Sequence, residues 1–469
     1  MSTKSRVSNW TSLTSSIVPG MVALSLAFSV GCGSSTAPAK PAAPAPSTSA
    51  PSGAAPSTSA PAGAEKPAAK DSGAAPSTSA PAAPAKVNEI IIGAVLPMTG
   101  GNAPNGFQIK SGYEMAVDEV NAEGGIKALG GAKLKLVIRD HEGKPDVGVR
   151  QAEAMVNDDK VVVALGTYMS GVTVPVSRAT ERLKTPLLVT DSMADEITQG
   201  GLKYLFRIDT KAELATKDML RGIKAFGDKL GSPVTKIALL NEDSAFGQSL
   251  KVNFEKQAPE LGLQIVENSS FKTGAPDLSA QAARIKASGA QWTVGSWYIT
   301  DMLTIIKTFP SQGLNPTRAS TFGGGMQTPS LLQAGDQAEG VTGFTMWNPD
   351  LKKERVKEVG EKFEKQYNVP MNQNGAKAYA GIWILKDVLE RAASTDKEKV
   401  REALVKTELA QGPAMIMPNS KITFDQTGQL QPSHIGIQVQ KGRFVTVWPD
   451  DVAAVQLDQT KVKQGMVLQ

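Results

Sequence analysis

The sequence has one cysteine, Cys32, and two histidines, His141 and His434, among 469 residues. A single cysteine excludes a disulfide within the chain, and the histidines lie too far apart to have the spacing of a metal site. The sequence also lacks a G-x-S-x-G elbow and a P-loop, because the "GGG" at 323–325 has no following Lys and Ser/Thr. We therefore expect no cofactor, no metal and no enzymatic activity.

Aromatic residues are also scarce, at 5% of the chain, and the formal net charge is only +5. The lysines and arginines are scattered, and no basic stripe interleaved with aromatic residues is present. The pattern therefore excludes nucleic acid as a partner. Apolar residues make up 41% of the chain, which is enough for a globular protein with substantial cores.

The only cysteine follows the apolar run "IVPGMVALSLAFSVG" at 17–31, which is preceded by Lys4 and Arg6. This run is shorter than the about 20 apolar residues of a membrane span, so 1–31 is predicted to be an export signal. "SVGC" resembles the lipobox of bacterial lipoproteins, with Ser29 where leucine is usual. The resemblance implies that Cys32 becomes the lipidated N-terminus, and an exported, unmodified cysteine is the alternative.

Residues 32–86 are rich in Ala, Pro, Ser and Thr, and "APSTSAP" occurs three times, from Ala45, Ala55 and Ala75. Such a segment cannot bury enough apolar surface to offset its ordering entropy. We expect a disordered tether that spans about 40 Å as a flexible coil. With the lipid anchor, it would hold the rest of the chain at a membrane, in the periplasm or on the outer cell surface.

After the tether, short apolar runs alternate with segments of helical spacing. The first run, 88–97, is followed by Ile109, Tyr113, Ala116 and Val120 at helical spacing. Further runs of this kind lie at 133–140, 161–167, 186–191, 236–243, 263–271, 292–297 and 318–324. Strands that alternate with helices predict parallel sheets with helices on both faces. The fold class is therefore α/β, with two doubly wound parallel-sheet lobes and a cleft between them.

The last third of the chain departs from this alternation. Two consecutive helices are expected at 353–367 and 375–393, followed by antiparallel strands joined by turns at Gly428 and Gly442. The predicted organisation is a first lobe at 87–209, a second lobe at 210–344, and returning segments at 345–469 that complete both lobes and the hinge. Ligands of such sheets bind beyond the carboxyl ends of the strands, so the cleft is the expected site.

Several stretches resemble one family, in order along the folded chain. They include "IGAVLPMTGGNAPNGFQIKSGYEMAVDEVNAEGGIKALGGAKLKLVIRD", "ALGTYMSGVTVPVS", "FRIDT", "NEDSAFGQSL", "AYAGIWIL" and "GPAMIMPNSKITFDQTGQ". Together they resemble the type I periplasmic solute-binding proteins of the leucine/isoleucine/valine group, which serve ABC transporters. The resemblance implies a venus-flytrap receptor, monomeric, that binds an amino acid or related zwitterion and delivers it to a membrane permease.

The resemblance also implies site residues. In "GTYMSGVT", Ser170 and the N–H groups that follow it, from Gly171 onward, would bind the ligand carboxylate at a helix N-terminus, with Thr173 one turn later. A helix cap is the alternative role for Ser170. In "VTDSMADEIT", Ser192 and Met193 replace the usual small residue followed by Ser or Thr.

In "EDSAFG", Phe246 would cover an apolar or ammonium part of the ligand, with core packing as the alternative. "VGSWYITDML" would supply Asp301 as the ammonium partner, with Trp297 and Tyr298 as walls, although Asp301 can equally be a favourable charge at a helix N-terminus. Asn105 stands where the leucine binders carry tyrosine, so the mouth of the pocket differs.

Two other functions remain compatible with the sequence. A sensor of the same fold would pass ligand occupancy to a membrane signalling partner, and a surface-anchored α/β enzyme would turn over a small metabolite. A permease and ATPase encoded nearby would favour transport, and turnover of a metabolite would favour the enzyme.

Overall fold

The computed structural model describes residues 87–462 and 465–468. The predicted signal, Cys32 and the predicted tether lie outside these residues. The first lobe is built on a parallel sheet with the strand order β2-β1-β3-β4-β5. Its strands are β1 (Glu89–Leu96), β2 (Lys133–Asp140), β3 (Val163–Gly166), β4 (Leu187–Val189) and β5 (Leu205–Arg207).

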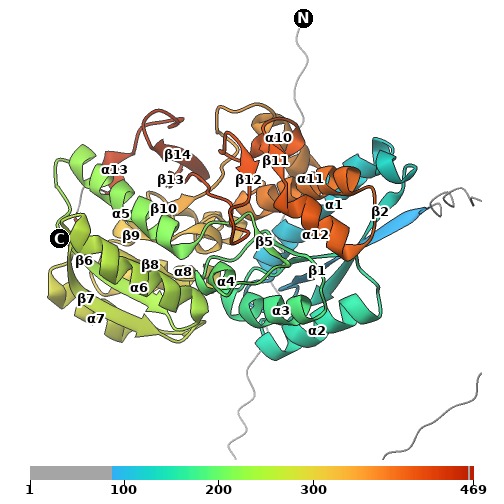
Figure 1. The fold of residues 1–469 in the computed structure, drawn as a ribbon. Coiled ribbons are helices and arrows are strands. Elements are labelled where there is room, and N and C mark those ends of the chain that lie inside the picture. The colour runs from blue at the N-terminus through green and yellow to red at the C-terminus, as the bar shows by residue number, and fades with distance from the viewer. Residues whose placement is uncertain (1–86, 463–464, 469) are drawn as a thin grey trace, which may run out of the picture. The chain divides into compact units, whose positions relative to one another are not determined.

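The first lobe forms because its central strands are apolar over their whole length and can be buried on both faces. Helices cover both faces of the sheet (Figure 1). They are α1 (Ala103–Ala122), α2 (Pro145–Asn157), α3 (Ser170–Arg182) and the short α4 (Glu196–Gln199), with the 3-10 turn η1 (Lys127–Leu129). Helices α1 and α2 each begin with a proline in the first turn, where the missing N–H is not needed.

The second lobe has its own parallel sheet, with the strand order β7-β6-β8-β9. Its strands are β6 (Lys236–Glu242), β7 (Gln264–Phe271), β8 (Trp292–Ser296) and β9 (Ala319–Ser320). Its helices are α5 (Ala212–Lys229), α6 (Ala245–Glu260), α7 (Ser279–Ser288), α8 (Ile299–Ser311) and α9 (Pro329–Leu332), with 3-10 turns η2 (Pro316–Arg318), η3 (Gly323–Gly325) and η4 (Gly335–Gln337). The prediction of two doubly wound α/β lobes is confirmed.

The returning segments divide between the lobes (Figure 1). Helices α10 (Val356–Tyr367), α11 (Gln373–Ala392) and α12 (Lys397–Val405) lie with the first lobe, where α11 packs along α1. Strands β10 (Thr342–Thr345), β13 (Ile435–Gln440) and β14 (Arg443–Trp448) form an antiparallel sheet, and Phe344 bridges to Phe322 just beyond β9 of the second lobe. The remaining elements are β11 (Glu408–Leu409), η5 (Pro413–Ile416), β12 (Ile422–Thr423) and α13 (Gln459–Val462).

One expected pairing is wrong. The turn at Gly442 does join two antiparallel strands, β13 and β14, but the strand before Gly428 pairs with β11 instead. The residues around Gly428 run beside β5, where Arg207 N donates to Gly428 O at 2.7 Å and Leu430 N donates to Arg207 O at 2.9 Å. Burial of this segment against the first lobe therefore outweighs local hairpin pairing.

The chain crosses between the lobes three times, at 208–211, 346–355 and 424–434. Side chains tie these crossings together: His434 bonds Asp218 at 2.7 Å and Thr210 at 2.9 Å, and Gln373 accepts from Met346 N at 2.9 Å. Three neighbouring crossings form a hinge that permits one lobe to rotate relative to the other. In residues 87–462 and 465–468, no helix is both long enough and apolar enough to cross a membrane.

Candidate functional site

A cavity lies between the lobes, at the carboxyl ends of strands from both sheets. The space among its lining residues is about 350 Å³, part of which is continuous with solvent, and every side chain that lines it is buried. The first lobe contributes Tyr168, Ser170, Asp191, Ser192, Met193, Asp209, Gln373, Asn374 and Lys377, and the second lobe contributes Phe246, Trp297, Tyr298, Phe322 and Gly323–Gly325. Burial of the whole lining shows that the lobes are closed on each other.

Ser170 is the first residue of α3 and lines the cavity, as the sequence predicts for a helix N-terminus. Its Oγ accepts from the backbone N–H groups of Met193 and Ala194, both at 3.2 Å, and lies 3.3 Å from Ser192 Oγ. Within the described residues the Ser170 hydroxyl accepts these hydrogen bonds and donates its own hydrogen to no side chain or carbonyl. This hydrogen and the positive end of α3 are therefore available to an anionic group in the cavity.

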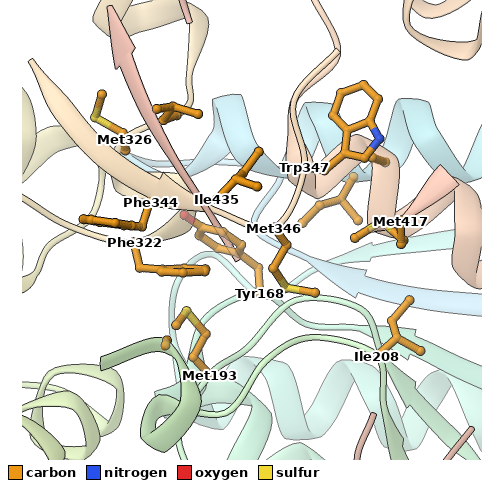
Figure 2. Close-up of a cluster of buried hydrophobic side chains, with 14 of the residues drawn as sticks. Tyr168, Met193, Ile208, Phe322, Met326, Phe344, Met346, Trp347, Met417 and Ile435 are labelled. Carbon is orange, nitrogen blue, oxygen red and sulfur yellow. The ribbon is translucent and has the colours of Figure 1, made fainter. Parts of the chain in front are cut away.

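Five aromatic side chains line the cavity in a chain that has few of them. The centroid of the Tyr168 ring in the first lobe lies 5.8 Å from that of the Tyr298 ring in the second lobe, and the Phe246 ring lies 5.4 Å from the Tyr298 ring. Figure 2 shows Tyr168 in the middle of the junction, near Phe322 and above Met193. An apolar or cationic part of a ligand would find aromatic faces here.

Two aspartates and a lysine form a buried charged group in the first-lobe wall. Asp191 and Asp209 follow the neighbouring strands β4 and β5, so the parallel sheet brings them to one edge. Lys377, in the second turn of α11, lies 2.8 Å from Asp191 Oδ1 and 2.9 Å from Asp209 Oδ1. All three side chains are at most 3% exposed.

The two aspartates differ in how well they are satisfied. Asp209 accepts from Ser192 N at 2.6 Å and from Thr210 N at 2.8 Å. In the part of the chain that the structure describes, Asp191 accepts from no backbone N–H group, and its contacts are the ion pair with Lys377 and the neighbouring Thr190 hydroxyl. Burial raises the pKa of Asp191 to about 6, against the attraction of Lys377 and with the repulsion of Asp209.

Six of the ten predicted ligand-binding residues line this cavity: Ser170, Ser192, Met193, Phe246, Trp297 and Tyr298. Four do not. Gly171 lies in the first turn of α3, and Thr173 Oγ1 bonds the hydroxyls of Thr167 at 2.8 Å and Ser192 at 2.6 Å, behind the cavity wall. Their contribution to ligand binding stays a prediction.

Asp301 also lies outside the lining. Its Oδ2 accepts from Tyr298 N at 2.9 Å and its Oδ1 accepts from Gly274 N at 2.8 Å, so the carboxylate caps the start of α8. This is the helix-terminus role that the sequence left open. Burial raises the pKa of Asp301 to about 6.

Asn105 is fully buried next to the cavity and connects the two lobes. Its Nδ2 donates to the Tyr168 hydroxyl at 2.9 Å and to Gly324 O at 3.2 Å, and its Oδ1 accepts from Asn374 Nδ2 at 3.0 Å. A second contact between the lobes involves Asp195, whose backbone N–H donates to Ser249 Oγ at 2.9 Å. These bonds stabilise the closed arrangement.

The buried charges leave one signal in the sequence. Asp191 and Asp209 each stand two residues after an apolar strand, in "PLLVTD" and "LFRID", and Lys377 interrupts the helix "NGAKAYAGIWIL" on a buried stretch. A lysine inside an apolar helix requires a partner. The described residues contain no group of three or more His, Cys, Asp or Glu side chains that could hold a metal ion.

Two α/β lobes that close over a small polar and aromatic cavity define a bilobal receptor for a small molecule. The family model of the periplasmic binding proteins matches residues 89–443. The chain belongs to this family, and it is a solute-binding protein.

Similar proteins support the same classification. The Leu/Ile/Val-binding protein homolog 7 of Brucella suis biovar 1 is 28% identical over 386 residues, which cover 79% of this chain and 94% of that protein. Leucine-binding protein LivK of Thermotoga maritima has a similar structure, with a TM-score of 0.68, 23% identity, and coverage of 77% of this chain and 100% of that chain. A solute-binding protein of an ABC transporter from R. palustris, solved with benzoate, has a TM-score of 0.68 at 17% identity, over 79% of this chain and 98% of that chain.

Proposed function

We propose that this protein is an extracytoplasmic receptor that captures a small amino acid or related zwitterion and delivers it to the permease of an ABC transporter. One observation carries the proposal: a buried cavity between two hinged lobes, with all its charged groups on the first-lobe wall and four of its five aromatic rings on the second-lobe wall. Such a cavity can hold a compact molecule with an ionic end and an apolar end. The names of the Brucella and Thermotoga relatives support an amino acid as the ligand.

Closure explains how such a receptor would work. Ser170 and the α3 N-terminus hold the ligand carboxylate, and Ser192 and Met193 form the adjacent loop. Phe246, Trp297 and Tyr298 then cover the rest of the ligand as the second lobe closes. A permease can recognise the closed form because the lobes expose a different combined surface when they close.

Calorimetry on the purified full chain tests this function with L-leucine, L-isoleucine, L-valine and L-phenylalanine. Hydrogen exchange on the same samples should slow at 168–171 and 191–194 in the first lobe and at 297–298 and 322–325 in the second lobe, because a ligand between the lobes protects both. Ser170→Ala should weaken binding roughly 10- to 150-fold, since it removes a hydrogen bond to a charged group. Protection in one lobe alone would contradict capture by closure.

We also propose that a lipid on Cys32 anchors the receptor at the membrane, which would keep a captured solute close to its permease. Two or three acyl chains give effectively permanent attachment, because each buried CH₂ contributes about 0.8 kcal/mol. Cys32→Ala should move the protein from the membrane fraction to the soluble fraction in cells. Cys32→Ala that stays in the membrane fraction would show that another part of the chain holds it there.

A further inference from the structure

The structure assigns a ligand-binding role to Asp191: we propose that its carboxylate holds a cationic nitrogen of the ligand. This inference rests on the proposed function as a solute receptor, and it names the chemical class of the solute. The ligand then carries an ammonium or alkylated ammonium group, and a bare aromatic or aliphatic carboxylate does not satisfy the site. Asp191 thus takes the role of ammonium partner that the sequence predicts for Asp301.

Asp191 is poorly supplied with donors on the cavity wall. Its side chain is 2% exposed, it accepts from no backbone N–H group in the described residues, and its contacts are the ion pair of Oδ1 with Lys377 and the neighbouring Thr190 hydroxyl. An ionised carboxylate that is buried without donors is costly, and a ligand ammonium would supply them. Asp301, by contrast, already accepts two backbone N–H groups and does not line the cavity.

The charges on the lining also favour Asp191 as the partner of a cation. Two carboxylates, Asp191 and Asp209, face one ammonium, Lys377, and the second lobe contributes no Asp, Glu, Lys or Arg to the lining. The nearby Arg207 is buried behind the wall, where it donates to the backbone oxygens of Ser192 at 3.1 Å and Ala194 at 2.7 Å. A cation in the cavity therefore has one carboxylate with free capacity, which is Asp191.

Asp191 is not required to neutralise Lys377. Asp209 already pairs with Lys377 at 2.9 Å, and its own oxygens are satisfied by Ser192 N and Thr210 N. Asp191 adds a second negative charge, and burial raises its pKa to about 6 because the charged form is poorly solvated there. A buried charge that destabilises the ligand-free protein in this way is expected at a binding site, where a ligand of opposite charge would pair with it.

Aromatic side chains complete the cation site. Tyr168 lies beside Asp191, since Tyr168 N donates to Asp191 O at 3.0 Å, and its ring faces Tyr298 across the cavity. Phe246 packs against Tyr298 at 5.4 Å. A cavity lined by both a carboxylate and aromatic rings attracts a cationic nitrogen through the charge of the carboxylate and the ring quadrupoles.

The test compares three groups of probes by calorimetry on the full chain at pH 7.5. The first group is L-leucine, L-phenylalanine and glycine betaine, which carry a cationic nitrogen. The second group is 2-hydroxy-4-methylpentanoate and 3-phenyllactate, the matched acids that carry a hydroxyl in place of the amine. The third group is benzoate and 4-hydroxybenzoate. We expect binding from the first group, and the matched hydroxy acid should bind roughly 10- to 150-fold more weakly than its amino acid.

The variant Asp191→Asn should lose roughly 10- to 150-fold in affinity for the amino acid but little for its hydroxy acid, because the amine and its partner act as a pair. Asp301→Asn is the matched control and should leave both affinities nearly unchanged. Ligand-free Asp191→Asn should be at least as thermostable as the natural protein at pH 7.5, since it lacks a buried charge. At pH 5, where Asp191 is mostly protonated, the two should unfold at similar temperatures.

Affinity for the amino acid should also fall as the pH drops from 7.5 to 5, because Asp191 takes up a proton and cannot pair with an ammonium group. The charged or titratable groups that face Asp191 are Lys377, Asp209, Tyr113 and Tyr168. Lys377 stays charged over this range because its pKa is raised by the two aspartates, and burial raises the pKa of both tyrosines. The pH dependence should therefore flatten in Asp191→Asn and persist in Asp301→Asn.

The outcomes separate the two proposals. Binding of benzoates or hydroxy acids in preference to amines would overturn the inference and leave the receptor function standing. An unchanged amino acid affinity in Asp191→Asn, or a loss in Asp301→Asn instead, would overturn it as well. If no probe of any group bound, the proposed amino acid receptor would fail, and the inference that depends on it would fail too.

Discussion

Gly324 provides a direct test of lobe closure. It lies in η3 of the second lobe, where a Cβ would be 2.3 Å from the Tyr168 hydroxyl oxygen and 3.0 Å from two carbons of the Tyr168 ring. Real Cβ atoms essentially never approach other heavy atoms within 3.0 Å, so either Tyr168 must move or the lobes cannot close fully. The substitution Gly324→Ala therefore opposes closure through a contact that exists only between the lobes.

The magnitude follows from the cost of overpacking. One added methyl group in a tightly packed site destabilises it by about 1–3 kcal/mol, and about 1.4 kcal/mol corresponds to a tenfold change in affinity. Gly324→Ala should therefore weaken ligand binding roughly 5- to 150-fold. The melting temperature of the ligand-free protein should change little, because the lobes can separate slightly and relieve the contact. Calorimetry with the amino acid that binds the natural protein measures the first effect, and thermal unfolding measures the second.

Two further variants make this reasoning refutable. At Gly325 a Cβ would be 1.9 Å from the backbone oxygen of Trp297, in the same lobe, so Gly325→Ala should lower the melting temperature whether the lobes are open or closed. Adding Tyr168→Phe to Gly324→Ala removes the atom at 2.3 Å and should restore part of the affinity. If Gly324→Ala bound the ligand as tightly as the natural protein, the bound lobes would not meet at this contact.

Two other substitutions probe the buried charges of the first lobe and the contact between the lobes. Lys377→Met leaves Asp191 and Asp209 buried without a cation, so it should destabilise the folded protein by about 3–5 kcal/mol in thermal or urea unfolding at pH 8. The loss of stability should be smaller at pH 5, where Asp191 is protonated in the folded state because its pKa is raised. An equal loss of stability at both pH values would contradict a charge effect. Asn105→Ala removes the donor to Gly324 O and to the Tyr168 hydroxyl. We therefore expect calorimetry to show roughly 2- to 13-fold weaker ligand binding. Unchanged affinity would exclude a role for Asn105 in closure.

The strands of both lobes could be predicted because each is a short apolar run bounded by polar residues. The expected strand at 133–140 coincides with β2, and the strands expected at 88–97 and 236–243 contain β1 and β6. Helix starts were less predictable. The helix expected at 375–393 begins two residues earlier, because Asn372 accepts from the backbone N–H groups of Asn374 and Gly375 and caps α11. Capping depends on one side-chain contact and leaves little trace in the apolar pattern.

Site residues could be predicted where they lie in a loop that directly follows a strand. Ser170, Trp297 and Tyr298 each follow a strand end, and the topology of parallel sheets brings such positions to the cleft. Lys377 could not be placed in this way, because it lies on a helix of the returning segments whose contact with β4 and β5 is purely tertiary. Asp301 illustrates the opposite error, since a carboxylate three residues into a helix serves the backbone of that helix as readily as a ligand.

The two lobes contribute different chemistry to the cavity, and this suggests an order of events. The first lobe carries the Ser170 hydroxyl, all the charged groups and one aromatic ring, Tyr168. The second lobe carries four aromatic rings, those of Phe246, Trp297, Tyr298 and Phe322. An ionic ligand approaching an open cleft is attracted over a longer range by charges than by aromatic faces, so it should bind the first lobe first. Closure then buries its apolar part against the second lobe and contributes free energy in proportion to the apolar area removed from water. Recognition of the ionic groups and recognition of the side chain would thus belong to successive steps, and a ligand that satisfied only the first lobe would bind without closing the receptor.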